Sequence, residues 1–301
     1  MVERKSINTL FFSYDGMTDP LGQSQVLPYI ERLTKQGYQV TLISFEKDER
    51  KARRPFIEQL TKKAGIDWHP IRYTKGLPVL GAMWNVRKLR KLALQLHQEK
   101  NFKLVHCRSL LPAIVALELK QKYGVKFLFD MRGFWADERV DGKVWNLSNP
   151  LFKSVYKYFK HKEKEALQQA DHVISLTHNG KKVIEEWGYG KAPISVIPCC
   201  VDLALFHATE EHPQQQRTNE LVIGYLGAIG TWYMLPEMMD FFQRLLLKYP
   251  NACFHFITRE DPEVIYREAA QRNIPKQHFK VEAANREDIP QKLLTWDFSI
   301  F

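Results

Sequence analysis

The feature that most constrains the fold is a regular alternation of short apolar runs with longer segments of helical spacing. Runs such as INTLFFS (residues 7–13) and YQVTLISF (38–45) have the length and composition of buried strands. Segments of about 10–15 residues, apolar at positions three and four apart, lie between such runs. Strands connected by helices of this length form βαβ units, which build a parallel sheet with helices on both faces. The sequence therefore predicts an α/β fold made of doubly wound parallel sheets.

The alternation is interrupted once, at residues 207–220. This stretch, HATEEHPQQQRTNE, is polar and has no periodicity, so we expect a linker there. A chain of 301 residues suits two domains, each able to bury its own core. We therefore expect a first domain at residues 1–206 and a second at residues 221–301. The second domain has four predicted strands, and no helix follows the last of them, so we expect this domain to be incomplete.

Charge is distributed unevenly along the chain. Residues 1–200 hold 34 Lys and Arg against 20 Asp and Glu, a balance of +14, whereas residues 201–301 hold 10 against 14, a balance of −4. A basic first part indicates an anionic partner, which by charge alone is nucleic acid, phosphate or a membrane surface. Because no nucleic-acid-binding motif is present, we expect no nucleic-acid partner.

Composition points to a cytoplasmic protein. No apolar run reaches the roughly 18 residues that span a bilayer, and the N-terminal segment has no apolar signal region. The cysteines have neither disulfide-scaffold nor zinc spacing, so we expect reduced thiols and no metal site. The cysteines are Cys107, Cys199, Cys200 and Cys253.

Two basic amphipathic segments are compatible with a peripheral protein on the inner face of the membrane. MWNVRKLRKLALQL (83–96) and LFKSVYKYFKHKEK (151–164) each place apolar side chains on one face and basic side chains around it. Such helices can lie on anionic lipid. They can equally be ordinary helices with a core face and a solvated basic face.

Five local sequences, in order along the chain, resemble motifs of the family-four glycosyltransferases of GT-B type, which are retaining enzymes that use sugar nucleotides. The first contains a glycine-bearing loop after a strand, the next two are strand–helix segments, and the last two are an interdomain signature and a glycine loop. They are YDGMTDPLGQSQVLPYIERLTKQGYQVTLIS, KLVHCRSLLPAIVALELKQKYGVKFLFDMRGFW, ADHVISLTHNGKKVIEEWG, ISVIPCCVDLALF and LVIGYLGAIG, which together lie within residues 7–235.

The resemblance implies two Rossmann-like domains and the transfer of a hexose-type residue, with retention, from a nucleoside-diphosphate sugar. The implied acceptor is a glycan or a lipid-linked molecule of surface polysaccharide synthesis. No metal or cofactor is implied, because the protein itself must hold the diphosphate and stabilise charge on the sugar. The nucleotide-sugar is then a substrate.

The sequence departs from the family's pattern in four places. Cys199 and Cys200 replace an Asn-Gly pair in the interdomain signature, and Arg132 replaces the usual histidine. The Arg and Lys that should follow Gly227 to hold the diphosphate are missing, and the paired-glutamate helix would come after the last residue. These departures support an alternative interpretation, a truncated and inactive transferase that only binds an acceptor or a membrane.

The candidate site lies in loops at the carboxyl ends of strands, where open α/β sheets bind ligands. The glycine-bearing loop after the first strand can bring its backbone close to an anion, or it can be a plain βα turn. The loop after strand 125–130 is rich in acids, arginines and aromatic rings, which suit phosphate and sugar but also form surface ion pairs. Asp130 is our candidate catalytic residue, as a polar contact to the acceptor. The expected binding residues of this domain are Asp15, Gly16, Gly22, Gln23, His106, Arg108, Arg132 and Trp135.

A second glycine loop follows the first strand of the second domain. Its glycines are three residues apart throughout, which differs from the dinucleotide fingerprint. Such a loop can cradle a diphosphate, or it can be a tight turn. The expected binding residues here are Gly227, Gly230 and Thr231.

Overall fold

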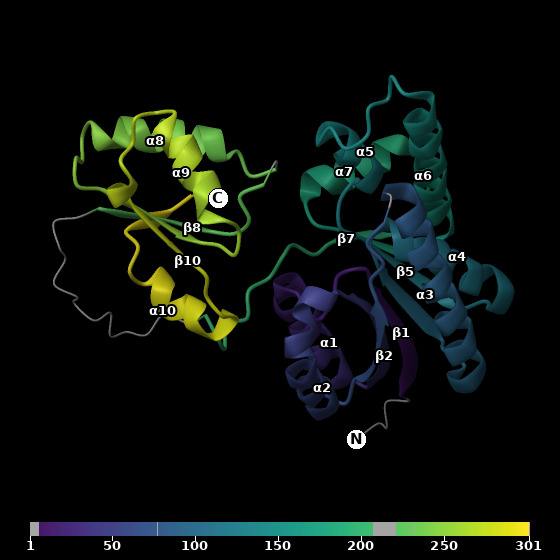
Figure 1. The fold of residues 1–301 in the computed structure, drawn as a ribbon. Helices are drawn as coiled ribbons and strands as arrows, with labels where there is room; N and C mark the ends of the chain where they lie inside the picture. Colours follow the sequence, from purple (N-terminus) through teal and green to yellow (C-terminus); the bar gives the residue numbers. More distant parts are fainter. Residues whose placement is uncertain (1–5, 77, 207–220, 231, 301) are drawn as a thin grey trace. The chain divides into compact units, whose positions relative to one another are not determined.

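The computed structural model describes residues 6–76, 78–206, 221–230 and 232–300. The chain divides into two compact units, Met1–Val201 and Asp202–Phe301 (Figure 1). The predicted linker at residues 207–220 lies outside the described residues. Each unit contains one parallel sheet, so the predicted α/β class is confirmed.

The first unit is built on a seven-stranded sheet with the order β3-β2-β1-β4-β5-β6-β7, in which every neighbouring pair is parallel. Because the order reverses between β1 and β4, a crevice for ligands is expected outside the carboxyl ends of these two strands. The strands are β1 (Ile7–Ser13), β2 (Tyr38–Glu46), β3 (Asp67–Arg72), β4 (Leu104–Arg108), β5 (Lys126–Met131), β6 (His172–Ser175) and β7 (Ile194–Val196).

Helices cover both faces of this sheet, as the periodicity predicted. The α-helices are α1 (Leu27–Thr34), α2 (Arg54–Lys63), α3 (Pro78–Lys100), α4 (Leu110–Tyr123), α5 (Trp135–Asp141), α6 (Pro150–Gln169) and α7 (His178–Trp187). Two shorter helical segments precede α1 and α2, the π-helical η1 (Gly22–Val26) and the 3₁₀-helical η2 (Asp48–Arg53). The segment between β1 and β2, where the alternation predicts a helix, therefore contains a π-helical turn followed by a short α-helix.

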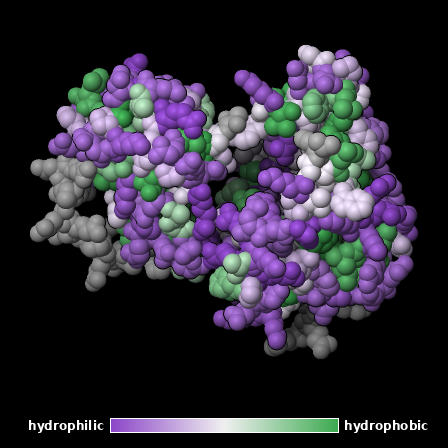
Figure 2. Space-filling model, in the orientation of Figure 1, coloured by the Kyte–Doolittle hydropathy of each residue, from purple (hydrophilic) through white to green (hydrophobic). Residues whose placement is uncertain are grey.

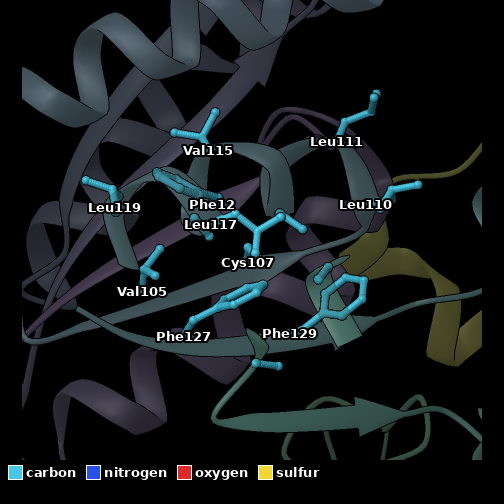
Figure 3. Packing of buried hydrophobic residues seen from close by; sticks show 14 of the residues in the cluster. Phe12, Val105, Cys107, Leu110, Leu111, Val115, Leu117, Leu119, Phe127 and Phe129 are labelled. Carbon is cyan, nitrogen blue, oxygen red and sulfur yellow. The ribbon is translucent and has the colours of Figure 1, made fainter. Parts of the chain in front are cut away.

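Both faces of the sheet are buried because successive residues of a strand point to opposite sides. In β1, Leu10 and Phe12 belong to one hydrophobic cluster and Phe11 belongs to another. Figure 3 shows the first cluster, in which Phe12 and Phe127 from the strands lie near side chains of α4. Strands buried on both faces are typical of parallel sheets with helices on each side.

The apolar faces of the two basic helices pack into this core. Leu89, Ala93 and Leu96 of α3 are buried, and so is Phe159 of α6. For these faces the structure supports the interpretation as core helices.

The second unit contains a four-stranded parallel sheet with the order β10-β9-β8-β11. A single hydrophobic cluster, which includes Phe242, Phe254 and Phe256, joins this sheet to its helices. In the described part of the chain, no helix is long and apolar enough to cross a membrane. The strands are β8 (Val222–Leu226), β9 (Cys253–Ile257), β10 (Phe279–Glu282) and β11 (Phe298–Ser299), and the helices are α8 (Leu235–Leu246), α9 (Pro262–Ala270), η3 (Lys276–His278), η4 (Arg286–Asp288) and α10 (Ile289–Leu293).

Candidate functional site

Charged side chains gather at the carboxyl ends of β1, β4 and β5. Arg108 is the last residue of β4 and lies in register with Ser13 of β1 and Asp130 of β5. Its Nε lies 3.3 Å from Oδ2 of Asp15, just beyond β1. The structure therefore brings the predicted residues Asp15, Arg108 and Asp130 together where the strand order reverses.

Asp130 is the centre of this group. Its Oδ2 lies 3.5 Å from Nε2 of His106, and its Oδ1 lies 3.5 Å from Nη1 of Arg132. Burial alone would raise the pKa of Asp130, but the adjacent His106 and the two arginines outweigh burial and hold the pKa below its usual value. The group is therefore an ionised carboxylate, 6% exposed, surrounded by donors.

The hydrogen-bond donors around Asp130 are not all paired within the described residues. Both contacts are longer than an ordinary hydrogen bond. Among the described residues, His106 Nε2 and Arg132 Nε are buried atoms without a hydrogen-bond partner. Buried polar atoms are normally satisfied, so these atoms are available to a ligand or a water molecule.

Tyr29, which was not among the predicted site residues, also borders this group. Its ring meets the His106 ring edge to face, with centroids 5.9 Å apart, and Phe11 covers His106 at 4.3 Å. Burial, and then the charge of Asp130, raise the pKa of Tyr29. Only the helical spacing of Tyr29 in α1 was visible in the sequence, and that spacing does not reveal which strand end the ring faces.

The glycine-bearing loop after β1 is held by a carboxylate of the protein itself. Glu46, the last residue of β2, accepts hydrogen bonds from the amides of Met17 (2.8 Å) and Thr18 (3.0 Å). It also accepts hydrogen bonds from the hydroxyls of Thr18 and Ser44. The sequence left open whether this loop approaches an external anion or is a plain βα turn, and in the structure these two amides face Glu46. The sequence signal for Glu46 was one acid ending an apolar strand.

The glycines of this loop are explained by close packing. A Cβ on Gly22 would lie 2.1 Å from the carbonyl oxygen of Gly16, and a Cβ on Gly16 would lie 2.7 Å from that of Phe45. Gln23 donates to the carbonyl oxygen of Thr18 at 3.0 Å. The structure thus brings Gly16, Gly22 and Gln23 together, in contacts within the loop.

The segment after β5 was expected to be a loop, and that expectation was wrong from residue 135 onward, where α5 begins. Trp135 packs edge to face against Trp145 and Phe159, with centroids 5.5 and 4.8 Å apart, and Arg139 lies over its ring. These tertiary contacts stabilise the short helix and account for Trp135 by packing.

Arg132 and Cys199, two departures from the family's pattern, are in contact. Arg132 Nη2 lies 3.2 Å from the Sγ of Cys199, just beyond β7. Arg132 therefore connects the Asp130 group with the end of the last strand of this sheet.

In the second unit, the loop after β8 is more open than the loop after β1. Gly230 is exposed, and a Cβ there would meet no atom within 4 Å, whereas a Cβ on Gly227 would lie 3.1 Å from the hydroxyl of Tyr225. Trp232 and Tyr233 follow with half-exposed rings. The predicted residue Thr231 lies outside the described residues. Within the described chain, no group of three or more His, Cys, Asp or Glu side chains is arranged to hold a metal ion.

Comparison with known proteins gives a family model and a set of structural neighbours. The model described as Glycosyltransferase Family 4 matches residues 23–205. No curated protein matches the chain in sequence. Among solved structures, a sucrose-phosphate synthase from Thermosynechococcus elongatus superposes with a TM-score of 0.72 at 15% identity, covering 97% of this chain and 74% of that one.

Two further neighbours share the fold at low identity. Alr3699/HepE from Anabaena, in complex with UDP and glucose, has a TM-score of 0.65 at 11% identity, covering 97% of this chain and 73% of that one. A UDP-GlcNAc 2-epimerase from Neisseria meningitidis bound to UDP-GlcNAc has a TM-score of 0.54 at 11% identity, covering 96% and 74%. Because a synthase and an epimerase both appear, these similarities establish the GT-B type of fold alone, and the kind of reaction follows from the family match.

Proposed function

Since the chain belongs to glycosyltransferase family 4, we propose that it transfers a sugar from a nucleoside-diphosphate sugar to a glycan or lipid-linked acceptor of surface polysaccharide synthesis. The observation that carries the proposal is the group of Asp15, His106, Arg108, Asp130 and Arg132 at the reversal point of the first sheet. It lies where doubly wound folds bind their ligands.

In this proposal Asp130 contacts the acceptor. An ionised carboxylate accepts a hydrogen bond from a sugar hydroxyl and orients it for attack. His106, and then Arg132 and Arg108, hold the pKa of Asp130 below its usual value, and the two arginines offer charged donors to anionic parts of the substrates. Transfer with retention of the anomeric configuration, without a metal or cofactor, is part of the same proposal.

The donor is proposed to be held by the loop after β8. Its glycines let the backbone approach a diphosphate closely, and backbone amides in such a loop bind anions. Two neighbours were solved with UDP or a UDP-sugar, which supports a uridine nucleotide as the first donor to test.

The test is a transfer assay in which the purified chain is incubated with a panel of nucleotide-sugars and a membrane glycolipid extract. Released nucleoside diphosphate and glycosylated product are measured. We expect Asp130→Asn to reduce turnover by at least about a hundredfold, as loss of a group that orients and polarises a reacting hydroxyl does. Asp48→Asn, which removes an exposed partner of Arg72, is the matched control and should keep full activity.

A chain that binds neither nucleotide nor nucleotide-sugar would contradict the transferase proposal and support the alternative of an inactive acceptor- or membrane-binding module. The anomeric configuration of the product, read from its NMR coupling constants, tests retention separately.

A further inference from the structure

The first two turns of α3 expose three large apolar side chains. Leu80, Met83 and Trp84 are 63%, 49% and 53% exposed. Residues three and four apart share one side of a helix, so these side chains form one continuous patch. Farther along α3, the apolar side chains of its inner face are buried in the core.

Basic side chains flank this patch. Arg87 and Lys91 continue the same side of the helix, and Lys75 precedes it, all three exposed. Within the described residues none of these three forms an ion pair, whereas neighbouring Arg90 is held by Glu118 at 2.6 Å. Their charges are therefore available to an external anion. We name these six residues the docking face: Lys75, Leu80, Met83, Trp84, Arg87 and Lys91.

Hydrogen bonds of Asn85 connect the helix that bears the docking face with the residue before Asp15. Asn85, on the inner side of the same turn, is fully buried. Its Oδ1 accepts from the amide of Thr74 (3.1 Å), and its Nδ2 donates to the hydroxyl of Tyr14 (3.2 Å). Tyr14 directly precedes Asp15 of the charged group. A surface that contacts the docking face is therefore held beside the acceptor side of the first sheet.

We propose that the docking face binds the surface of an anionic lipid bilayer. Apolar side chains, including a tryptophan, beside unpaired cations match a bilayer interface, where rings enter the headgroup boundary and cations meet phosphates. A second copy of the chain fits less well, because it would bring the same cations against each other. Why docking is useful rests on the proposed function, since a lipid-linked acceptor is presented at such a surface, but the docking itself does not depend on activity.

The test is co-sedimentation of the full chain with vesicles. We expect binding to vesicles of phosphatidylcholine mixed with phosphatidylglycerol, and little binding to phosphatidylcholine alone. Replacing two apolar residues together, Leu80→Ser with Trp84→Ser, should weaken binding by at least about tenfold. Arg87→Glu with Lys91→Glu should weaken it by about tenfold or more and reduce its dependence on salt.

Two further variants separate docking from misfolding. Leu247→Ser with Lys248→Glu alters an exposed leucine (86% exposed) and its neighbouring lysine in the second unit, and should leave vesicle binding unchanged. Trp84→Phe keeps an apolar ring and should retain most of the binding. Near-ultraviolet circular dichroism checks the fold of each variant.

Three outcomes overturn the proposal. These are no binding of the full chain to the mixed vesicles, equal binding by the docking-face variants and the control, and a fall in molecular mass by light scattering in those variants, which would identify a second copy as the occupant. Because vesicle binding needs neither donor nor acceptor, it is judged separately from the transfer assay.

Discussion

Each sheet of the protein has a buried histidine beside a carboxylate from the neighbouring strand, and the two pairs are built differently. His255 of β9 uses both ring nitrogens, accepting from Trp296 Nε1 at 2.8 Å and contacting Glu282 at 2.8 Å. His106 of β4 lies 3.5 Å from its carboxylate, and its Nε2 has no hydrogen-bond partner among the described residues. The satisfied pair stabilises its sheet, whereas the unsatisfied pair keeps hydrogen-bonding capacity at the candidate site.

The glycine loops differ in the same way. In the first unit, the amides of Met17 and Thr18 are engaged by Glu46. In the second unit, the amides of Ala228 and Gly230 donate no hydrogen bond to the described part of the chain. The protein's own carboxylate therefore occupies the backbone donors of the first loop, whereas two amides of the second loop have no acceptor in the described part of the chain.

The largest effect on stability is expected from alanine in the closed loop. Gly22→Ala places a Cβ 2.1 Å from a backbone oxygen, so the loop or η1 must move, at a cost of about 3 kcal/mol. Gly230→Ala meets open space and should change stability by less than about 0.5 kcal/mol. Chemical denaturation of both variants is the measurement. Equal losses would show that the two loops do not differ in packing.

Removing the internal anion should have the next largest effect. Glu46→Ala leaves the amides of Met17 and Thr18 buried without an acceptor, which costs about 2–3 kcal/mol. Hydrogen exchange of these two amides should accelerate in the variant. Glu31→Ala, which breaks an exposed pair with Lys35, is the control and should leave their exchange unchanged. Unchanged protection in Glu46→Ala would mean that the loop is held by other contacts.

The same substitution in the two histidines tests their roles directly. His255→Phe leaves Trp296 Nε1 without its acceptor and should destabilise the second unit by about 2 kcal/mol. His106→Phe removes a looser 3.5 Å contact, and Arg132 and Arg108 still offset the burial of Asp130, so it should cost only about 1 kcal/mol. It should also raise the pKa of Asp130 and reduce transfer. Urea unfolding, with hydrogen exchange read separately for β9 and β4, distinguishes the two. A larger loss of stability from His106→Phe than from His255→Phe would show that His106, and not His255, is the structural histidine.

A smaller effect is expected on the affinity for the sugar nucleotide. Gly230→Asp puts a negative charge into the open loop and should weaken UDP binding by about tenfold, because like charges repel at short range. Asn251→Asp adds the same charge before β9, at the amino edge of the sheet, and should leave affinity unchanged. Calorimetric titration with UDP measures both, and equal affinities would place the diphosphate away from this loop.

The smallest effect is expected in the dependence of the second unit's stability on acidic pH. Burial, and then Lys280, lower the pKa of His255, so below about pH 6.5 the unfolded chain binds more protons than the folded one and stability falls. The hydrogen bond from Lys292 is the largest contribution that lowers the pKa of Glu282 to about 2. The stabilisation that ionised Glu282 provides is therefore lost as the pH falls from the ordinary pKa of a glutamate towards 2. The double variant His255→Phe with Glu282→Gln should flatten the pH profile of the second unit, and an unchanged profile would exclude this network as its cause.

The sequence predicted the layers of the fold better than the contacts of the site. Apolar runs such as residues 7–13 coincide with strands because burial on both faces requires uninterrupted apolar residues. Helix α5 was missed because its stability depends on Trp145 and Phe159, which are distant in sequence. A strand-end position was enough to group Asp15, Arg108 and Asp130. It could not show that Glu46 fills the first loop, since glycine spacing is the same whichever group occupies the space.

Gly224 in the middle of β8 limits which substitutions this protein can accept during evolution. A Cβ at residue 224 would lie 1.7 Å from a ring carbon of Trp296, so the indole occupies the volume that any larger residue would need. Gly224→Ala alone causes a collision, and Trp296→Leu alone opens a void beneath β8. The two positions are therefore expected to accept change only as a pair. A homologue with alanine at position 224 should have a smaller side chain at position 296. It should also have another hydrogen-bond donor for His255, because the Nε1 of Trp296 would be lost.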